Sequence, residues 1–152
     1  LPFPEPLGEP ADATLGEAHE PETHLIPNVL AAAKAGTPIK VFGTQFPTKD
    51  GTCIRDYIHV EDLALAHVMA INRMKRGAQP FNLGNQRGYS VREVIAACEE
   101  ASGKRIAIDF CPPREGDPPA LIASASKVRK AWNWKPKHDL RSIVGSAWEW
   151  HK

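Results

Sequence analysis

Two arginines in unusual surroundings give this sequence its strongest chemical signal. Arg55 comes just before an apolar strand that the pattern predicts at residues 57–60, and Arg114 lies among prolines in a stiff loop at residues 112–119. A guanidinium group keeps its charge and donates paired hydrogen bonds, which suits the oxygens of a diphosphate. Asp117 could accept hydrogen bonds from ribose hydroxyls, or it could brace the loop. The pattern favours a nucleotide diphosphate site, with two solvated surface arginines as the alternative.

The motifs of dinucleotide-dependent redox chemistry are missing from this sequence. Such motifs place closely spaced glycines where a strand turns into a helix, so that a pyrophosphate can approach the backbone. Here Gly84 and Gly88 are followed by no third glycine at the required spacing. Neither Tyr57 nor Tyr89 has a lysine four residues later that would complete a Tyr-x-x-x-Lys base. We therefore predict no catalytic and no cofactor-binding residue in this chain.

Histidines and cysteines show no metal-binding or nucleophilic pattern. The histidines are scattered, so neither a metal site nor a histidine-based catalytic pair is predicted; they are His19, His24, His59, His67, His138 and His151. The cysteines lack Cys-x-x-Cys spacing, which indicates reduced thiols in a cytoplasmic protein; they are Cys53, Cys98 and Cys111. Trp132 and Trp134 lie two residues apart, as do Trp148 and Trp150. One member of each pair should therefore face the core and the other should lie nearer solvent.

The composition is that of one globular domain. The chain has 152 residues, of which 42% are hydrophobic and 24% charged, and its net charge is +1. This balance supplies no general attraction for nucleic acid or for an anionic membrane. No apolar run approaches the roughly 18 residues of a membrane span, and the first residues lack the regions of a signal peptide. We expect neither a nucleic-acid partner nor a membrane partner.

Apolar spacing and capping residues predict about five helices. The first covers residues 24–34, and the third follows the capping box Ser90-Val-Arg-Glu93. A short helix at residues 126–132 and a last helix capped by Asp139 complete the C-terminal part. The second helix runs from Glu61 to just before Gly77. Its apolar face is predicted to consist of Leu63, His67, Ala70, Ile71 and Met74.

Short apolar runs between these helices predict strands. They lie at residues 39–42, 57–60, 80–84 and 106–110. Because strands and helices alternate, the predicted fold class is α/β. Residues 1–23 hold five prolines and show no period, so they should form an irregular arm. The folded portion would then be residues 24–152.

Five segments stand in the order and spacing found in UDP-galactose 4-epimerases, and the chain resembles that family over roughly residues 9–152. They are Pro21-Glu-Thr-His-Leu-Ile-Pro27, Ile39-Lys-Val-Phe-Gly43, Asp50-Gly-Thr-Cys-Ile-Arg-Asp-Tyr-Ile-His-Val60, Phe81-Asn-Leu-Gly84 and Arg114-Glu-Gly-Asp117. The family belongs to the extended short-chain dehydrogenase/reductases, which have a Rossmann-type fold. The resemblance implies that this chain is the C-terminal, substrate-binding portion, without the N-terminal half that binds NAD.

The resemblance also assigns sugar- and diphosphate-binding roles. It implies that His24 and Leu25 border the sugar and diphosphate, and that Arg55 and Arg114 hold the diphosphate. Leu121 would lie beside the hexose, at a position where some members carry a tyrosine. The smaller side chain leaves open whether N-acetylated sugars are accepted.

The nucleoside would be held by residues from several elements. Three successive residues are expected along the uracil; they are Lys40, Val41 and Phe42. Tyr57 and Val91 would line the nucleoside pocket, and Asp117 would accept hydrogen bonds from the ribose.

Members of the family use bound NAD to oxidise the C4 hydroxyl of the hexose and then return hydride to the other face. This chain lacks the glycine turn and the tyrosine base, so by itself it should be inactive. Its expected partners are UDP-galactose or UDP-glucose, together with the NAD-binding half or a second copy of the chain. Alternatives are a stand-alone or split UDP-sugar-binding module, a related nucleotide-sugar epimerase or dehydratase, and an interaction domain that uses the tryptophan-rich C-terminal helix.

Overall fold

Five helices organise the described part of the chain, which in this computed structural model comprises residues 5–6, 14–73 and 75–152. They are α1 (Leu25–Ala35), α2 (Val60–Arg73), α3 (Val91–Ser102), α4 (Ser126–Trp132) and α5 (Leu140–His151). The predicted capping box is confirmed, because Ser90 Oγ accepts the Glu93 N–H at 3.1 Å and the Glu93 carboxylate accepts the Ser90 N–H at 2.8 Å. No described helix combines the length and apolar composition of a membrane span.

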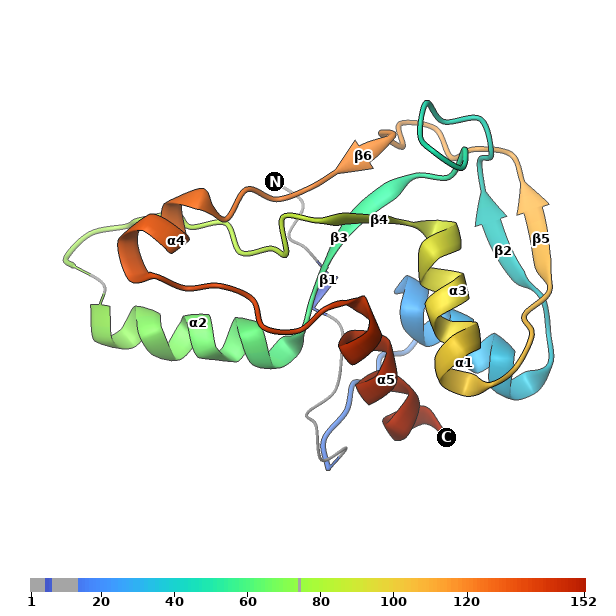
Figure 1. Cartoon of the computed structure of the whole chain (residues 1–152), viewed down its shortest axis with the longest axis horizontal. Coiled ribbons are helices and arrows are strands. Elements are labelled where there is room, and N and C mark those ends of the chain that lie inside the picture. Colours follow the sequence, from blue (N-terminus) through green and yellow to red (C-terminus); the bar gives the residue numbers. More distant parts are fainter. Residues whose placement is uncertain (1–4, 7–13, 74) are drawn as a thin grey trace.

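Short strands pair around β3, the central strand of the fold (Figure 1). The strands are β1 (Glu5–Pro6), β2 (Ile39–Phe42), β3 (Ile54–Ile58), β4 (Gly88–Ser90), β5 (Ile108–Cys111) and β6 (Ala120–Leu121). β3 pairs in parallel with β1 and β6 and antiparallel with β4. A separate parallel pair joins β2 to β5. The predicted α/β class is therefore confirmed.

Three of the predicted strands differ in the structure. The strand expected at residues 57–60 is β3 at Ile54–Ile58, because Val60 already begins α2. The strand expected at 106–110 is β5 at Ile108–Cys111. Residues 80–84 form no strand, although Phe81 and Leu83 are half-buried and Asn82 is exposed, because no described strand lies beside them to complete a ladder. The prediction of a strand at these residues was therefore wrong.

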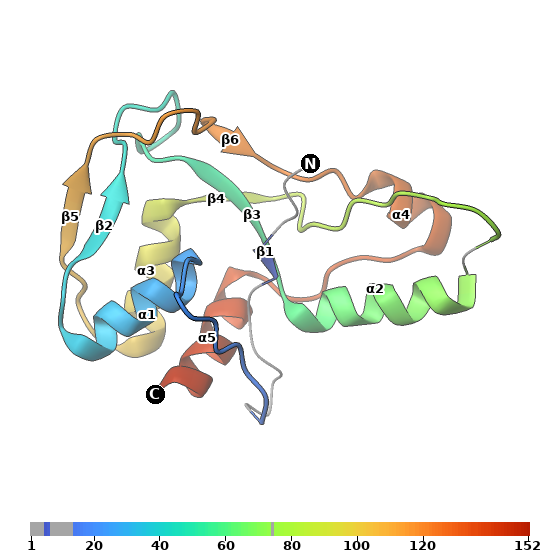
Figure 2. The same cartoon turned by 180° about the vertical axis from the view of Figure 1, so that it is seen from behind.

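The main core lies where α1, α3 and α5 pack together beside β2 and β3 (Figure 2). Its fully buried residues include Ile26, Leu30, Val41, Tyr57 and Ile143, each at most 2% exposed. Burial of this apolar surface is the main stabilising contribution to this end of the molecule.

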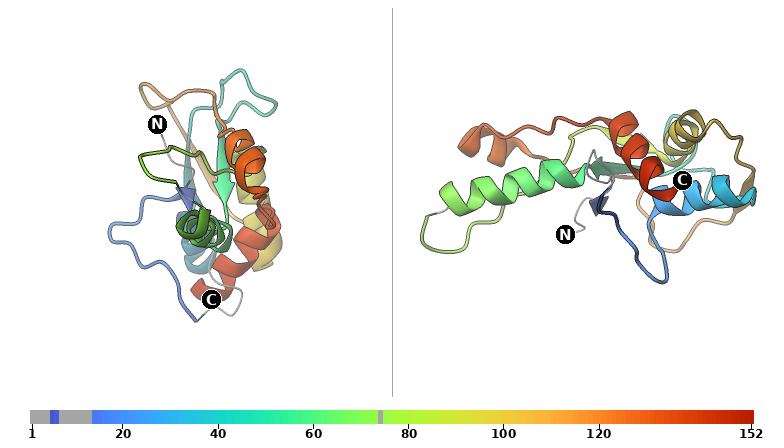
Figure 3. Two further views of the ribbon diagram at one scale, coloured as in Figure 1. Left: turned by 90° about the vertical axis from the view of Figure 1, so that its left-hand side faces the viewer. Right: turned by 90° about the horizontal axis from the view of Figure 1, so that it is seen from below.

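A second, smaller core lies between α2 and α4, at the opposite end of the elongated molecule from β2 and β5 (Figures 1 and 3). Its buried residues are Ile58, Ala66, Ala125, Val128, Trp132 and Trp134. Both Trp132 and Trp134 are buried, so the prediction that one of them lies nearer solvent was wrong. The reason is that Trp134 follows the end of α4 and turns back to donate its Nε1–H to the Asp62 carbonyl at 3.2 Å.

The buried face of α2 also differs from the prediction. His67 and Ile71 are exposed, Ile71 to 83%, whereas Asp62 and Ala66 are buried. Met74, the last residue of the predicted face, lies outside the described residues. The buried carboxylate explains the difference, because Asp62 accepts the backbone N–H groups of Lys137 and His138 and so draws its own face of the helix inward.

Candidate functional site

Arg55 is held in place by the loop that precedes β6. In the parallel β3–β6 pair it stands opposite Leu121. Its Nη1 donates to the carbonyls of Ile54 at 2.8 Å and Pro118 at 3.0 Å, and its Nη2 lies 3.1 Å from Asp117 Oδ1. The structure thus brings three predicted site residues together. It also shows Asp117 bracing the loop, one of the two roles considered for this side chain.

Arg114 lies over the ring of Phe42, with its guanidinium carbon 4.1 Å from the ring centroid. The β2–β5 pair explains this contact: β2 ends at Phe42 and β5 at Cys111, and Gly43 N–H donates to the Cys111 carbonyl at 2.9 Å. The segments that follow β2 and β5 therefore leave the sheet side by side. Arg114 is exposed, so it stacks on an aromatic face and keeps its hydrogen-bond donors available.

The charges of Arg55 and Arg114 both affect the pKa of the buried Cys53 thiol. Burial raises the pKa of Cys53, the charge of Arg55 lowers it, Asp117 raises it, and Arg114 lowers it. Burial prevails, so the thiol stays protonated at neutral pH and is no candidate nucleophile. Arg55 and Arg114 therefore both act electrostatically on Cys53, the residue just before β3.

Asp50 ties the loop before β3 to the start of α3. Its Oδ1 accepts hydrogen bonds from Thr52 N at 2.9 Å and Thr52 Oγ1 at 2.7 Å, and its Oδ2 accepts one from Ser90 Oγ. Burial raises the pKa of Asp50, but the hydrogen bonds from Ser90 and Thr52 outweigh it and lower the pKa overall. Sequence reasoning did not single out Asp50. The Asp50-Gly51 pair in the sequence is typical of a turn in which the Asp side chain accepts nearby backbone N–H groups. In the structure Gly51 has φ of 81°.

The remaining predicted site residues lie on four elements and differ in exposure. His24 and Leu25 stand at the start of α1, and Val91 begins α3. Lys40 is exposed on β2. Val41 and Tyr57 are each 2% exposed and pack in the main core, so their side chains lie beneath the surface. The side chain of His24 contacts Glu22 and Glu17, and its common role with Arg55 and Arg114 stays a prediction.

A groove on the described surface lies apart from the predicted site residues. It runs between α3 and α5 and is lined by residues that include Tyr89, Glu93 and Arg141. None of the predicted site residues lines it.

His59 and His138 form one of two histidine clusters. Their rings stack with centroids 4.1 Å apart and an interplanar angle of 25°, and His138 Nε2 lies 3.3 Å from a Glu61 oxygen. Ring nitrogens donate and accept in the plane of the ring, so nearly parallel stacked rings do not direct their lone pairs at one ion. Burial and the neighbouring His138 lower the pKa of His59. This cluster packs the residues just before α2 against those just before α5.

Comparisons with known proteins find similar epimerases. Residues 13–84 match the model of the NAD dependent epimerase/dehydratase family. The UDP-glucose 4-epimerase of Halalkalibacterium halodurans is 45% identical over 149 residues. That alignment covers 95% of this chain but 45% of the relative.

Solved structures give the same result. The UDP-glucose 4-epimerase of Bifidobacterium longum in complex with NAD+ and UDP has a TM-score of 0.90 at 38% identity, covering 96% of this chain and 44% of that one. The enzyme of Stenotrophomonas maltophila with bound NAD and formylated UDP-arabinopyranose has a TM-score of 0.89 at 39% identity, with 95% and 44% coverage. The chain therefore spans under half the length of these relatives. On sequence and fold together, it is similar to UDP-glucose 4-epimerases and carries a match to the NAD dependent epimerase/dehydratase family at residues 13–84.

Proposed function

We propose that this chain provides the UDP-sugar-binding part of a UDP-glucose 4-epimerase. The observation that carries the proposal is the braced pair Arg55–Asp117, together with Arg114 stacked on Phe42, in a chain similar to an epimerase solved with NAD+ and UDP. In the proposed complex, Arg114 and the remaining donors of Arg55 bind the diphosphate. Asp117 accepts hydrogen bonds from the ribose, and Phe42 lies beside the uracil.

The local geometry supports this assignment energetically. Arg55 is already fixed by three hydrogen bonds, so an anion that binds it meets a preorganised donor and loses less side-chain entropy. Prolines on both sides of Arg114 similarly restrict the loop that carries it. Charge-assisted hydrogen bonds to phosphate are among the strong polar interactions of proteins.

Titration of the 152-residue chain with UDP by calorimetry tests the proposal. Replacing Arg114 by alanine should weaken UDP binding by about 1.5–3 kcal/mol, the usual contribution of a hydrogen bond to a charged group. Arg105→Ala is the matched control, because the Arg105 side chain is 95% exposed and its ion pair with Glu99 lies away from the candidate residues. Equal UDP affinity for the Arg114 and Arg105 variants would remove the diphosphate role, and no binding by the parent chain would remove the proposal.

We further propose that the chain does not interconvert UDP-galactose and UDP-glucose by itself. The glycine-rich turn and the Tyr-x-x-x-Lys base are missing from the sequence, so NAD and the catalytic base would belong to the part of the protein that relatives have beyond this region. Coupled detection of UDP-glucose formed from UDP-galactose checks this expectation. Turnover by the pure 152-residue chain supplied with NAD would contradict it.

The outer face of α2 supports a need for that additional part. Leu65, Val68 and Ile71 follow one another at three-residue spacing and are 37%, 56% and 83% exposed. An apolar stripe of this kind usually packs against another protein surface. We propose the NAD-binding part as its neighbour, with self-association of the chain as the alternative. The free cysteines, Cys53, Cys98 and Cys111, support a cytoplasmic location for the whole protein.

A further inference from the structure

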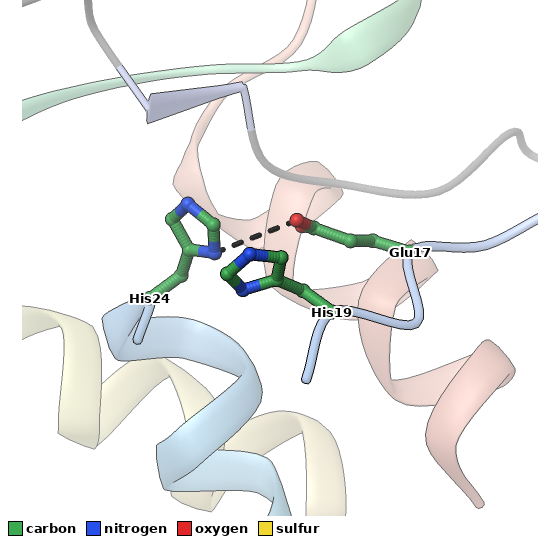
Figure 4. A group of neighbouring side chains, drawn as sticks. All are labelled: Glu17, His19 and His24. Atoms are coloured by element: carbon green, nitrogen blue, oxygen red, sulfur yellow. Dashed lines mark ion pairs between the residues drawn. The ribbon is translucent and has the colours of Figure 1, made fainter. Parts of the chain in front are cut away.

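We propose that Glu17, His19, Glu22 and His24 form a binding site for a divalent transition-metal ion of the zinc type. These residues lie in the segment that leads into α1. Figure 4 shows three of them, Glu17, His19 and His24. The proposal goes beyond the UDP-sugar role of the chain and does not depend on it. It also departs from the sequence-based expectation that the histidines are scattered, because the structure brings His19 beside His24.

The separations of the donor atoms fit a tetrahedral ion. One donor atom each from Glu17, His19 and His24 lies within 4.8 Å of the others. With metal–ligand bonds of about 2.1 Å, tetrahedral donors stand about 3.4 Å apart. His24 Nδ1 and Glu17 Oε1 are 3.5 Å apart, so this pair already has the spacing. His24 Nδ1 lies 2.8 Å from Glu22 Oε1, so a metal ion would replace that hydrogen bond and move the carboxylate back slightly.

The charges around His24 favour a cation. Two carboxylates face the same edge of one imidazole ring, which concentrates negative charge at Nδ1. Imidazole and carboxylate together are ligands that suit zinc and similar ions, whereas magnesium and calcium prefer oxygen alone.

The ring arrangement separates this cluster from the stacked pair of His59 and His138. The rings of His19 and His24 are tilted by 55°, with centroids 5.7 Å apart. Tilted rings at this separation can direct one nitrogen each at a common ion, which nearly parallel stacked rings cannot. His19 is exposed and the Glu17 side chain is 38% exposed, so both can adjust at little cost in packing.

Metal binding would change the chemistry of His24. When Nδ1–H donates to Glu22, Nε2 carries no proton and accepts hydrogen bonds. With Nδ1 bound to a metal, the proton of the neutral ring moves to Nε2, which becomes a donor. If His24 borders the sugar, as the family resemblance implies, the ion would alter the hydrogen bonding offered to the ligand. This last step alone depends on the proposed function.

Calorimetric titration of the 152-residue chain with Zn²⁺ alone, without nucleotide, tests the site. We expect one ion per chain, and His19→Ala or Glu17→Gln should weaken binding at least about tenfold. His67→Ala is the matched control, because this exposed histidine lies on α2, outside the cluster. Substitution of Co²⁺ for Zn²⁺ should give the visible absorption of a tetrahedral site, which His19→Ala abolishes and His67→Ala keeps. Circular dichroism verifies that the exposed substitutions leave the fold intact.

Three results would overturn the site. They are no zinc binding by the parent chain, equal affinity in the His19, Glu17 and His67 variants, and loss of binding in Cys111→Ser, which would place the ion at a thiol. Because no nucleotide is present, these results are independent of the outcome of the UDP titration.

Discussion

Trp134→Ala should lower the free energy of unfolding by about 3–5 kcal/mol, the usual cost of removing a buried aromatic side chain. Trp134 is 2% exposed, belongs to the small core between α2 and α4, and donates its indole N–H to the Asp62 carbonyl. The substitution removes both the packing and the hydrogen bond that joins the end of α4 to α2. Urea unfolding followed by far-ultraviolet circular dichroism measures the loss.

Trp150→Ala supplies the comparison. Trp150 is 37% exposed on α5, so its loss should cost well under half as much. An equal loss for the two variants would show that the second core contributes no particular stability. Since Trp132, Trp148 and Trp150 remain in Trp134→Ala, their fluorescence can still report on both ends of the molecule.

Asp56→Ala should destabilise the chain by a similar amount, about 2–5 kcal/mol, because it leaves two part-buried backbone donors without an acceptor. Asp56 is 5% exposed and accepts the N–H groups of Asn85 at 2.9 Å and Ala123 at 3.1 Å. The carboxylate thereby joins β3 to two loops that form no strand of their own. A Cβ at Gly84 would lie 2.5 Å from Asp56 Oδ2, so the glycine provides the space that this arrangement requires.

The pH dependence gives a second measurement on Asp56. Burial raises its pKa in the folded state, more than the N–H groups of Asn85, Ala123 and Gln86 lower it. The folded chain therefore holds this proton more tightly than the unfolded chain, in which the pKa is about 3.9. The contribution of Asp56 to stability falls as pH rises from about 3.9 through the raised value, and Asp56→Ala should lack this slope.

Asp109→Ala is the control for both measurements, because Asp109 is exposed on β5 and has no recorded side-chain hydrogen bond. Its effect should stay within about 0.5 kcal/mol. A loss for Asp56→Ala no greater than that for Asp109→Ala would contradict the view that Asp56 holds the two loops.

Local chemistry made the helices and their ends predictable. Ser90 with Glu93, and Asp139 with the N–H of Ser142, act as the caps that their positions indicated, and Gly36 and Gly103 take left-handed conformations at the ends of α1 and α3. Each of these features depends on contacts within a few residues. The sequence alone therefore contains the information that decides them.

Features that depend on distant partners were missed. The small strand β6 exists because its residues meet β3, and the burial of Asp62 depends on backbone groups near residue 137. In the candidate site, too, local features were predictable and contacts between distant residues were not. Arg55, Arg114 and Asp117 were recognisable from residue type and neighbours, but the ion pair between Arg55 and Asp117 required the fold. The roles of all the predicted site residues in UDP-sugar binding stay predictions.

The strand pairing has a consequence for the kinetics of folding. Each recorded pair joins segments far apart in the chain: Ile39 with Ile108, Ile54 with Ser90 and Ala120, and Glu5 with Tyr57. No two consecutive described strands form a hairpin, so no strand pairing can form early from neighbouring residues. Helices form quickly from local contacts, whereas such pairings must wait for long loops to close. We therefore expect the helices to form well before β3 acquires its neighbours, so the environment of Arg55 is completed among the last steps of folding.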